Sequence, residues 1–214
     1  MTMNNIIMGI ISRILEVPQI WNLSQFVLGG NASKRKLYRS VFTGKGKMLD
    51  FGCADGNTFM AFKDFDYYGI DIDAKFIDYA RRKFRNYPNA HWLCADILDM
   101  PIEINPFDYI LFASTGHHIP DNLIYPILES LIALLKRGGQ LYIIDMISKP
   151  NTDNWWGKLL IKFDQGQFTR TEAQYVEILS NLQDRVAVIN TSIRKMRGNF
   201  FPLPDFFIAV LEKM

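Results

Sequence analysis

The chain has 214 residues, of which 49% are apolar and 14% aromatic, and its 24 basic and 22 acidic residues give a formal net charge of +2. This length and composition predict one globular domain, or one domain with a small appendage, that buries roughly 70% of the unfolded chain's surface. They exclude a disordered, collagen-like or coiled-coil protein. The near balance of charge, without a basic stripe, is atypical of a dedicated nucleic-acid binder.

The N-terminal residues 1–43 are predicted to form a helical cap. Ile6, Ile10 and Ile14 recur at every fourth position, which is typical of an amphipathic helix that packs on the domain or on a partner. The apolar stretch is too short to span a bilayer and Arg13 follows it at once, so we expect neither a transmembrane segment nor a signal peptide. A contact of this helix with a membrane surface stays an alternative.

Strand and helix patterns alternate from residue 47 onward. Short apolar runs predict strands at residues 47–51, 67–71, 90–94, 107–113 and 140–145, and amphipathic patterns predict helices at 73–85 and 122–136. Asp73 is the expected N-cap of the first helix, and Gly138 and Gly139 are expected to end the second. Strands separated by helices indicate a parallel, doubly wound sheet within a domain at 44–214.

The last third of the chain has a different pattern. Residues 146–170 are predicted to be a substrate-side insertion, with a loop and a short aromatic helix. Thr171 and Gln174 have the spacing of a capping box and predict the start of a further helix. Apolar runs at 185–197 and 203–211 predict an antiparallel hairpin. The expected fold class is therefore α/β, a doubly wound and mostly parallel seven-stranded sheet with a C-terminal antiparallel hairpin and N-terminal helices.

A loop rich in small residues follows the first strand, where a doubly wound fold places its ligand. The dinucleotide-binding pattern needs glycine at the first, third and sixth positions, but these are Gly52, Ala54 and Asn57. The loop also lacks the Lys-Ser or Lys-Thr pair of a triphosphate-binding loop. Asp50 at the end of the strand suits a cationic ligand, and the glycines allow a ligand to approach the backbone closely.

The pattern Asp50-x-Gly52-x-Ala54-x-Gly56 resembles the first motif of the Rossmann-like, class I S-adenosylmethionine-dependent methyltransferases, with Ala54 where many members have glycine. Four further segments in the same order resemble later motifs: Tyr68–Asp71, Ala95–Ile97, Phe107–Ser114 and Leu135–Leu141. The resemblance covers roughly residues 45–145 and returns in the terminal hairpin. It implies that the protein is a small-molecule methyltransferase that binds S-adenosyl-L-methionine and releases S-adenosyl-L-homocysteine.

The resemblance also implies the roles of individual residues. Asp71 is expected to accept hydrogen bonds from both ribose hydroxyls, while Asp96 accepts one from the adenine amino group and Ile97 packs against the ring. Cys53 is expected to be a small filler rather than a nucleophile. The complete set of implied cofactor-binding residues is Asp50, Gly52, Cys53, Ala54, Gly56, Asp71, Ile72, Asp96, Ile97, Ala113 and Ser114.

The substrate side is less defined by the sequence. The segment after the fourth strand has neither the Asn/Asp-Pro-Pro-Tyr/Phe motif of amide and nucleobase N-methyltransferases nor the acidic cluster of magnesium-dependent members, so we expect no metal. His117 and His118 are candidates for a general base, and a packing role is the alternative. A small, partly apolar or aromatic acceptor is expected, with O- or C-methylation favoured over N-methylation. The predicted substrate-side residues are Trp21, Phe26, Trp155, Trp156, Phe168 and Arg170.

Three other functions stay open. The basic clusters at 34–39 and 81–85 would serve a tRNA or protein methyltransferase, and the N-terminal helix would serve a membrane-associated lipid methyltransferase. A non-catalytic S-adenosylmethionine binder would keep the loop without the chemistry. We expect a small-molecule partner rather than a nucleic acid, and a monomer or a homodimer. Cys53 and Cys94 form no disulfide or metal motif, which indicates a reducing, cytoplasmic location.

Overall fold

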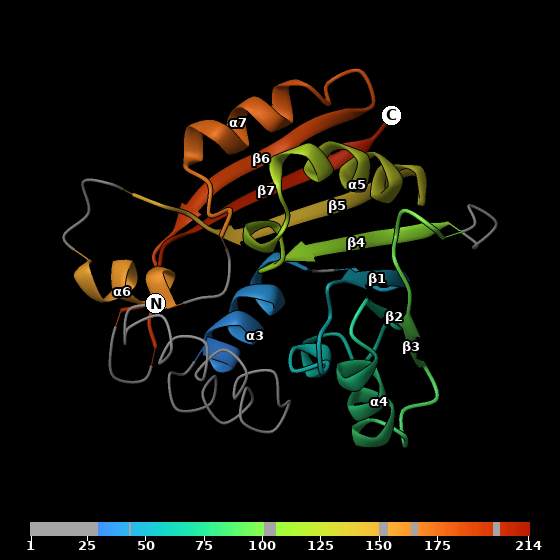
Figure 1. Ribbon diagram of the computed structural model, residues 1–214. Helices are drawn as coiled ribbons and strands as arrows, with labels where there is room; N and C mark the ends of the chain where they lie inside the picture. The colour runs from blue at the N-terminus through green and yellow to red at the C-terminus, as the bar shows by residue number, and fades with distance from the viewer. Residues whose placement is uncertain (1–29, 43, 101–105, 150–153, 164–166, 199–201) are drawn as a thin grey trace.

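The computed structural model describes residues 30–42, 44–100, 106–149, 154–163, 167–198 and 202–214 (Figure 1). A seven-stranded sheet with the strand order β3-β2-β1-β4-β5-β7-β6 runs through the middle of the molecule. Its strands are β1 (Lys47–Phe51), β2 (Asp66–Asp71), β3 (Ala90–Cys94), β4 (Phe107–Ala113), β5 (Leu135–Met146), β6 (Val186–Arg194) and β7 (Phe206–Lys213). The helical elements are α3 (Gly30–Val41), η1 (Phe59–Ala61), α4 (Ala74–Lys83), η2 (Gly116–His118), α5 (Asp121–Ala133), α6 (Trp155–Phe163) and α7 (Glu172–Ser180).

Strands β1 to β5 pair in parallel, and β7 pairs antiparallel with both β5 and β6. This arrangement confirms the predicted mostly parallel sheet and its C-terminal antiparallel hairpin. Because the strand order reverses beside β1, the carboxyl ends of β1 and β4 lie next to each other at the point where such a sheet binds ligands.

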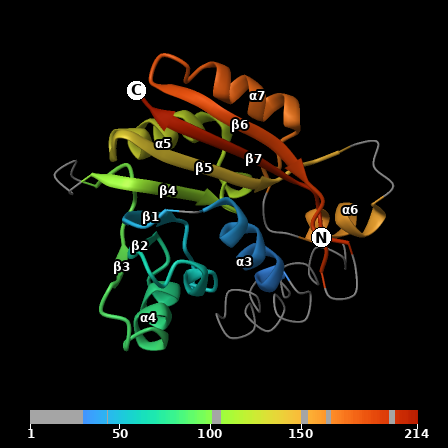
Figure 2. The same ribbon diagram turned by 180° about the vertical axis from the view of Figure 1, so that it is seen from behind.

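The sheet is covered on both faces, and the side chains of β5 show how. Leu141 and Ile143 face the layer formed by α5 and α7, whereas Tyr142 and Ile144 face the layer formed by α3, η1 and α4. The views from both sides show the same two layers (Figures 1 and 2). A strand buried on both faces carries apolar residues at successive positions rather than in alternation, which is why the sequence of β5 reads as a continuous apolar run.

The junction between α5 and β5 differs from the prediction. The helix predicted at 122–136 ends at Ala133, and β5 begins at Leu135, so that Lys136–Gly139 lie within the strand. Leu135 pairs with Phe107 and Gln140 pairs with Tyr109, which leaves four residues of β5 opposite one of β4. Gly138, at φ 74°, allows the chain to bulge there, so the glycine pair interrupts a strand instead of ending a helix.

The helix caps agree with the sequence. The Asp73 side chain accepts a hydrogen bond from the backbone of Lys75 at the start of α4, and Thr171 and Gln174 form a reciprocal capping box at the start of α7. Residues 1–29 of the predicted cap lie outside the described residues, and α3 is the part of it that the structure describes. The division into a cap, a domain and an insertion stays a prediction. Among the described helices, none has the length and apolar character needed to cross a membrane.

Candidate active site

The loop after β1 is held in a backbone conformation that side chains disfavour. Gly52, Ala54 and Gly56 have φ values of 72°, 47° and 68°, and the amides of Gly52 and Cys53 both donate to the carbonyl oxygen of Ile70 at 2.9 and 3.1 Å. A side chain at position 52 would collide with Thr115. The first motif is therefore a tight, left-handed turn hydrogen-bonded to β2, and the glycines in such a turn allow a ligand to approach the backbone closely. The positive φ of Ala54 explains why glycine, which adopts such a conformation without strain, would suit position 54.

Asp71 closes this loop. One carboxylate oxygen accepts from the amide of Ala54 and the other from the amide of Asp73, both at 2.9 Å. Burial raises the pKa of Asp71 above its usual range, while these backbone donors lower it. Each carboxylate oxygen keeps a second lone pair, so Asp71 can bind the loop and still accept hydrogen bonds from a diol.

Asp50 lies buried behind the loop, with an exposed fraction of 3%. The Tyr67 hydroxyl donates to it at 2.6 Å. Burial raises the pKa of Asp50 to about 7, helped by the charge of Asp71 and opposed by Tyr67 and by Lys34 of α3. Tyr38, also from α3, is buried nearby, and burial together with the charge of Asp50 raises its pKa. Helix α3 thus contributes to the same site as the loop, a contact that no local pattern of the sequence predicts.

The segment after β3 places its apolar residues differently from the prediction. Asp96 is exposed and its carboxylate accepts from the amide of Leu98 at 2.9 Å. Ile97, the predicted packing partner of an adenine ring, is only 3% exposed and belongs to the core under α5. Leu98 and Ile72 are 41% and 75% exposed and have the open apolar surfaces that such a ring needs. The spacing of the motif does not tell which of these neighbouring apolar side chains turns inward, so the sequence does not distinguish Leu98 from Ile97.

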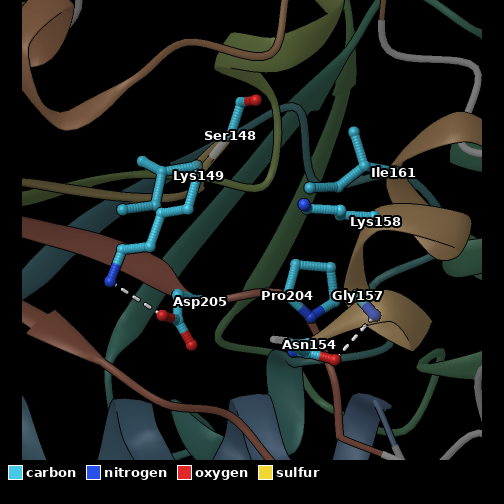
Figure 3. A pocket seen from close by; sticks show the side chains of 9 residues that line it. Ser148, Lys149, Asn154, Gly157, Lys158, Ile161, Pro204 and Asp205 are labelled. Atoms are coloured by element: carbon cyan, nitrogen blue, oxygen red, sulfur yellow. Dashed lines mark hydrogen bonds and ion pairs between the residues drawn. The ribbon is translucent and has the colours of Figure 1, made fainter. Parts of the chain in front are cut away.

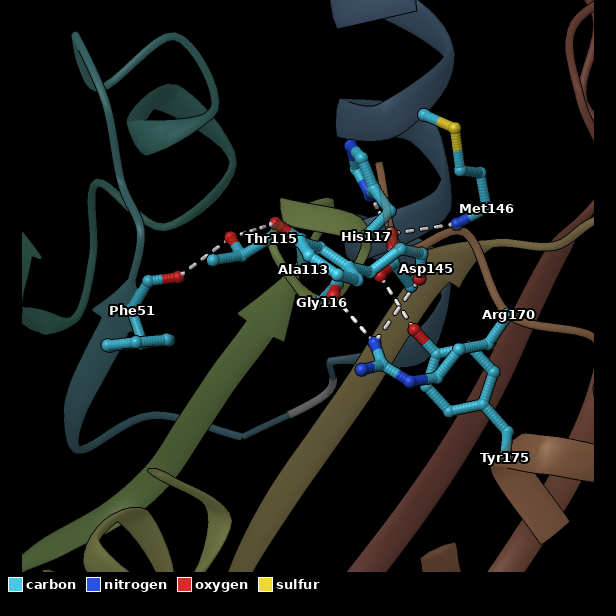
Figure 4. A network of polar contacts seen from close by, with 10 residues as sticks. Phe51, Ala113, Thr115, Gly116, His117, Asp145, Met146, Arg170 and Tyr175 are labelled. Carbon is cyan, nitrogen blue, oxygen red and sulfur yellow. Dashed lines mark hydrogen bonds and ion pairs between the residues drawn. The ribbon is translucent and has the colours of Figure 1, made fainter. Parts of the chain in front are cut away.

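The end of β4 is joined to the end of β1. The Thr115 hydroxyl contacts the carbonyl oxygens of Phe51 at 3.3 Å and of Ala113 at 3.0 Å (Figure 4). Ser114 has a φ of 53°, and its amide donates to Ile144 at 2.8 Å. A second strained turn therefore lies directly beside the first, and together they form the edge of the site.

His117 is buried, with an exposed fraction of 2%, and its Nδ1 lies 2.5 Å from Oδ1 of Asp145. The Tyr175 hydroxyl donates to Oδ2 of Asp145 at 2.7 Å, and the amide of Met146 donates to Oδ1 at 2.9 Å. Although burial alone would raise the pKa of Asp145, His117 and these donors hold it below its usual value. Since an ionised carboxylate only accepts, Nδ1 is the donor, and the other ring nitrogen points away from Asp145 toward α3 (Figure 4).

His118, the second candidate base, is exposed, and its ring lies against that of His117 at a tilt of 45°, with 4.2 Å between centroids. The structure therefore separates the two adjacent histidines, one fixed by a buried carboxylate and one at the surface. In the part of the chain that the structure describes, no group of three or more His, Cys, Asp or Glu residues is placed to hold a metal.

Arg170 lies inside the protein rather than along an open wall. Its guanidinium donates to the carbonyl oxygen of Gly116 at 2.7 Å (Figure 4). It also donates to the carbonyl oxygen of Ile119 at 2.8 Å and to the carboxylate of Asp121 at 2.6 Å. Arg170 therefore fixes the loop that carries the histidines. The alternative of a surface role does not fit an exposed fraction of 2%.

The other predicted substrate-side residues are spread more widely. Trp155 is 61% exposed at the start of α6 and stacks on Trp156 with 4.2 Å between ring centroids. Phe168 is half-buried, and its amide donates to the carbonyl oxygen of His117 at 2.9 Å, which places it beside the histidine loop. Trp21 and Phe26 lie outside the described residues.

The architecture and the loop geometry together define the class of protein. A switch-point loop closed by the acid of β2, on a sheet with an antiparallel C-terminal hairpin, is the arrangement expected of Rossmann-like S-adenosylmethionine-dependent methyltransferases. Residues 48–139 match the family described as "Methyltransferase domain". This segment of the chain, which makes up less than half of its length, is therefore similar to that family.

Known relatives agree with this assignment. The chain is 29% identical over 84 residues to a demethylmenaquinone methyltransferase of Staphylococcus saprophyticus, a match that covers 39% of this chain and 35% of that protein. A protein of the same name from Listeria welshimeri is 28% identical over 89 residues, covering 41% and 36% of the two chains. The matched region thus spans about a third of the length of these curated relatives.

Solved structures share the fold. The N-methyltransferase NodS of Bradyrhizobium japonicum, in complex with S-adenosyl-L-homocysteine, superposes with a TM-score of 0.69 at 16% identity, covering 94% of this chain and 95% of that one. A DhpI-SAM-HEP complex superposes with a TM-score of 0.68 at 18% identity, covering 99% and 100% of the two chains. At these identities the similarity establishes the fold alone.

The left-handed turn gives a prediction about stability. Ala54→Gly should leave the free energy of unfolding unchanged or raise it by up to about 1 kcal/mol, because it relieves a positive φ at the entropic cost of a glycine. Gly52→Ala should lower it by more than about 1 kcal/mol, because position 52 has both a positive φ and Thr115 in the way. Denaturant unfolding of the two variants measures both effects. A decrease in the free energy of unfolding of Ala54→Gly as large as that of Gly52→Ala would contradict this account of the loop.

The buried Asp50 gives a second prediction. Its pKa is raised from 3.8 to about 7 in the folded protein, so the folded state binds a proton more tightly than the unfolded state between these pH values. The contribution of Asp50 to stability is therefore largest at the acid end and is lost as the pH rises toward 7. Asp50→Asn should remove this loss, and the stability of the variant relative to the wild type should grow from pH 4 to pH 7. A difference that does not change with pH would show that Asp50 is not desolvated.

Proposed function

We propose that the protein transfers a methyl group from S-adenosylmethionine to a small, partly apolar or aromatic acceptor. The observation that carries this proposal is the left-handed loop at Gly52, Ala54 and Gly56, closed by Asp71 and backed by the buried Asp50. The donor set suits the cofactor, because a carboxylate pairs with a cationic amino-acid end and a second carboxylate accepts from the two hydroxyls of a ribose. The exposed Ile72 and Leu98 offer apolar surfaces for adenine.

The protein's own contribution to the reaction is alignment and exclusion of water. The bound cofactor supplies an activated methyl group, so the chain needs to fix the acceptor in line with it and to accept any proton that the nucleophile loses. His117 fits the second task, since Asp145 fixes its tautomer and turns its other nitrogen toward the α3 side of the site. An oxygen or carbon nucleophile that must lose a proton before it attacks would use this base. A neutral amine can attack without losing a proton first, so the presence of a base favours O- or C-acceptors over amines.

The relatives bear on the acceptor only indirectly. The curated matches are named demethylmenaquinone methyltransferases, but they cover only 39% and 41% of this chain, which supports methyl transfer more than a particular acceptor. An aromatic or quinol acceptor agrees with the exposed Trp155 and the half-buried Trp156, which stack on each other on the predicted substrate side. A cytoplasmic location and a small-molecule partner belong to the same proposal.

The test compares the two histidines. His117→Gln should lower turnover of a phenol or naphthoquinol acceptor by about 10²- to 10⁴-fold and remove the acid limb of the pH–rate profile, because a positioned base is lost. His118→Gln should have a much smaller effect, and His91→Gln, on the far strand β3, is the matched control. Methyl transfer is measured with labelled cofactor across a panel of acceptors.

Three outcomes would count against parts of this proposal. Full activity of His117→Gln with an unchanged pH profile would contradict the base assignment. A loss of turnover in His118→Gln alone would indicate that the exposed His118, and not His117, is the base. Cofactor binding without turnover of any acceptor would indicate a non-catalytic binder.

A further inference from the structure

Helix α3, helix α6 and the connection between β6 and β7 meet at one end of the molecule, as the views from both sides show (Figures 1 and 2). The Ser33 hydroxyl of α3 donates to the carbonyl oxygen of Arg197 in that connection. Nδ2 of Asn154, the residue before α6, donates to the carbonyl oxygen of Leu203, and its Oδ1 accepts from the amide of Gly157, both at 2.8 Å (Figure 3). Hydrogen bonds therefore hold the three segments together as one surface, which we call the α3–α6 surface.

The α3–α6 surface is rich in positive charge. Helix α3 and residues 194–198 contain no acidic residue, and the acid that precedes β7, Asp205, pairs with Lys149 at 2.8 Å (Figure 3). Arg194 lies opposite Phe206 in the pairing of β6 with β7, so its side chain points to the face of the sheet that α3 covers. Five basic residues are exposed or half-buried here and make no ion pair in the described part of the chain: Arg35, Lys36, Arg194, Lys195 and Arg197.

Apolar side chains of α6 lie next to these cations. Trp155 is 61% exposed and stacks on Trp156, and Leu159, Leu160 and Ile161 of the same helix are only half-buried. An indole has an apolar body and one polar N–H group, which suits the boundary between lipid headgroups and acyl chains. A surface that binds nucleic acid would use the cations but would gain little from an aliphatic helix beside them. Basic residues next to an exposed tryptophan and aliphatic side chains therefore favour a lipid surface.

We propose that the α3–α6 surface docks on an anionic lipid bilayer. The cations meet the phosphate headgroups, where each basic residue strengthens binding about fivefold, and Trp155 enters the headgroup boundary. The free ring nitrogen of His117 points toward α3, so docking turns the substrate side of the candidate active site toward the membrane (Figure 4). Apolar molecules concentrate in a bilayer, so docking would raise the local concentration of an apolar acceptor. The docking adds a partner to the proposed function, and the binding itself does not depend on that function.

Sedimentation of the full chain with sucrose-loaded vesicles tests the docking. Vesicles of phosphatidylcholine mixed with phosphatidylglycerol should bind the wild type at least about tenfold more strongly than pure phosphatidylcholine vesicles, and salt should weaken this preference by screening. Lys36→Gln combined with Lys195→Gln should lower binding to the anionic vesicles roughly 10- to 30-fold, because two cations are lost. Trp155→Ala should lower it several-fold through the loss of apolar contact. Arg82→Gln combined with Arg85→Gln removes the same charge from exposed positions at the end of α4 and is the matched control, with binding within about twofold of the wild type.

Equal binding to neutral and anionic vesicles, or an equal loss in the α4 control, would overturn the inference. Retention of a single-stranded RNA by a chain that does not bind vesicles would also overturn it, because the cations would then serve a nucleic acid. Thermal unfolding of the Lys36→Gln and Lys195→Gln variant checks that its fold is intact. Titration of S-adenosylhomocysteine without vesicles reports separately on the proposed function. A protein that binds this product but not vesicles loses only the docking, whereas one that binds vesicles but not the product loses only the function.

Discussion

The carboxylate of Asp71 is the contact on which the rest of the site depends. It accepts hydrogen bonds from the loop after β1 and from the start of the segment that leads into α4. Asp71 therefore joins the connections that follow β1 and β2 at the carboxyl edge of the sheet. The loop can adopt its left-handed path because Gly52 and Gly56 have no side chain to oppose it, and Ala54 bears the remaining strain. Parallel pairing of β1 with β2 brings Asp50 opposite Gly69 and holds the two acids close together.

A second polar network supports the other half of the edge. Asp145 at the end of β5 accepts from His117 and Tyr175, and Arg170 binds the carbonyl groups of the same loop. Three elements far apart in the sequence, the loop after β4, the strand β5 and the helix α7, are thereby fixed around one buried carboxylate. Such a buried network is stable only when each member is satisfied, so the position of His117 depends on all of its neighbours.

The sequence predicts most of the sheet because its strands are short apolar runs separated by clear turn residues. The strands at 47–51, 90–94 and 107–113 have the predicted bounds. The sequence predicts a helix at 122–136 that Gly138 and Gly139 end, because glycine pairs commonly stop helices, and only the pairing with β4 reveals a bulge there. The local pattern around this segment contains no information about its partner strand.

The same limit applies to the site. The motif residues from Asp50 to Asp71 come from one continuous stretch, and a linear pattern suffices to find them. A linear pattern does not reveal the hydrogen bond from Tyr67 to Asp50 or the effect of the Asp50 charge on the pKa of Tyr38, because these residues come from a neighbouring strand and from a helix that packs across the sheet. The inward turn of Ile97 and the burial of Arg170 depend equally on tertiary packing, which spacing along the chain does not encode.

The central claim is that the loop closed by Asp71 binds S-adenosylmethionine, and a calorimetric titration with S-adenosylhomocysteine tests it most directly. The account predicts one site per chain in the wild type, an affinity at least about tenfold lower in Asp71→Asn, where a charged acceptor is lost, and no change in Asp108→Asn, a carboxylate that pairs with Lys136 at the other end of the sheet. Absence of binding to the wild-type chain, or equal affinity in Asp71→Asn, would contradict it.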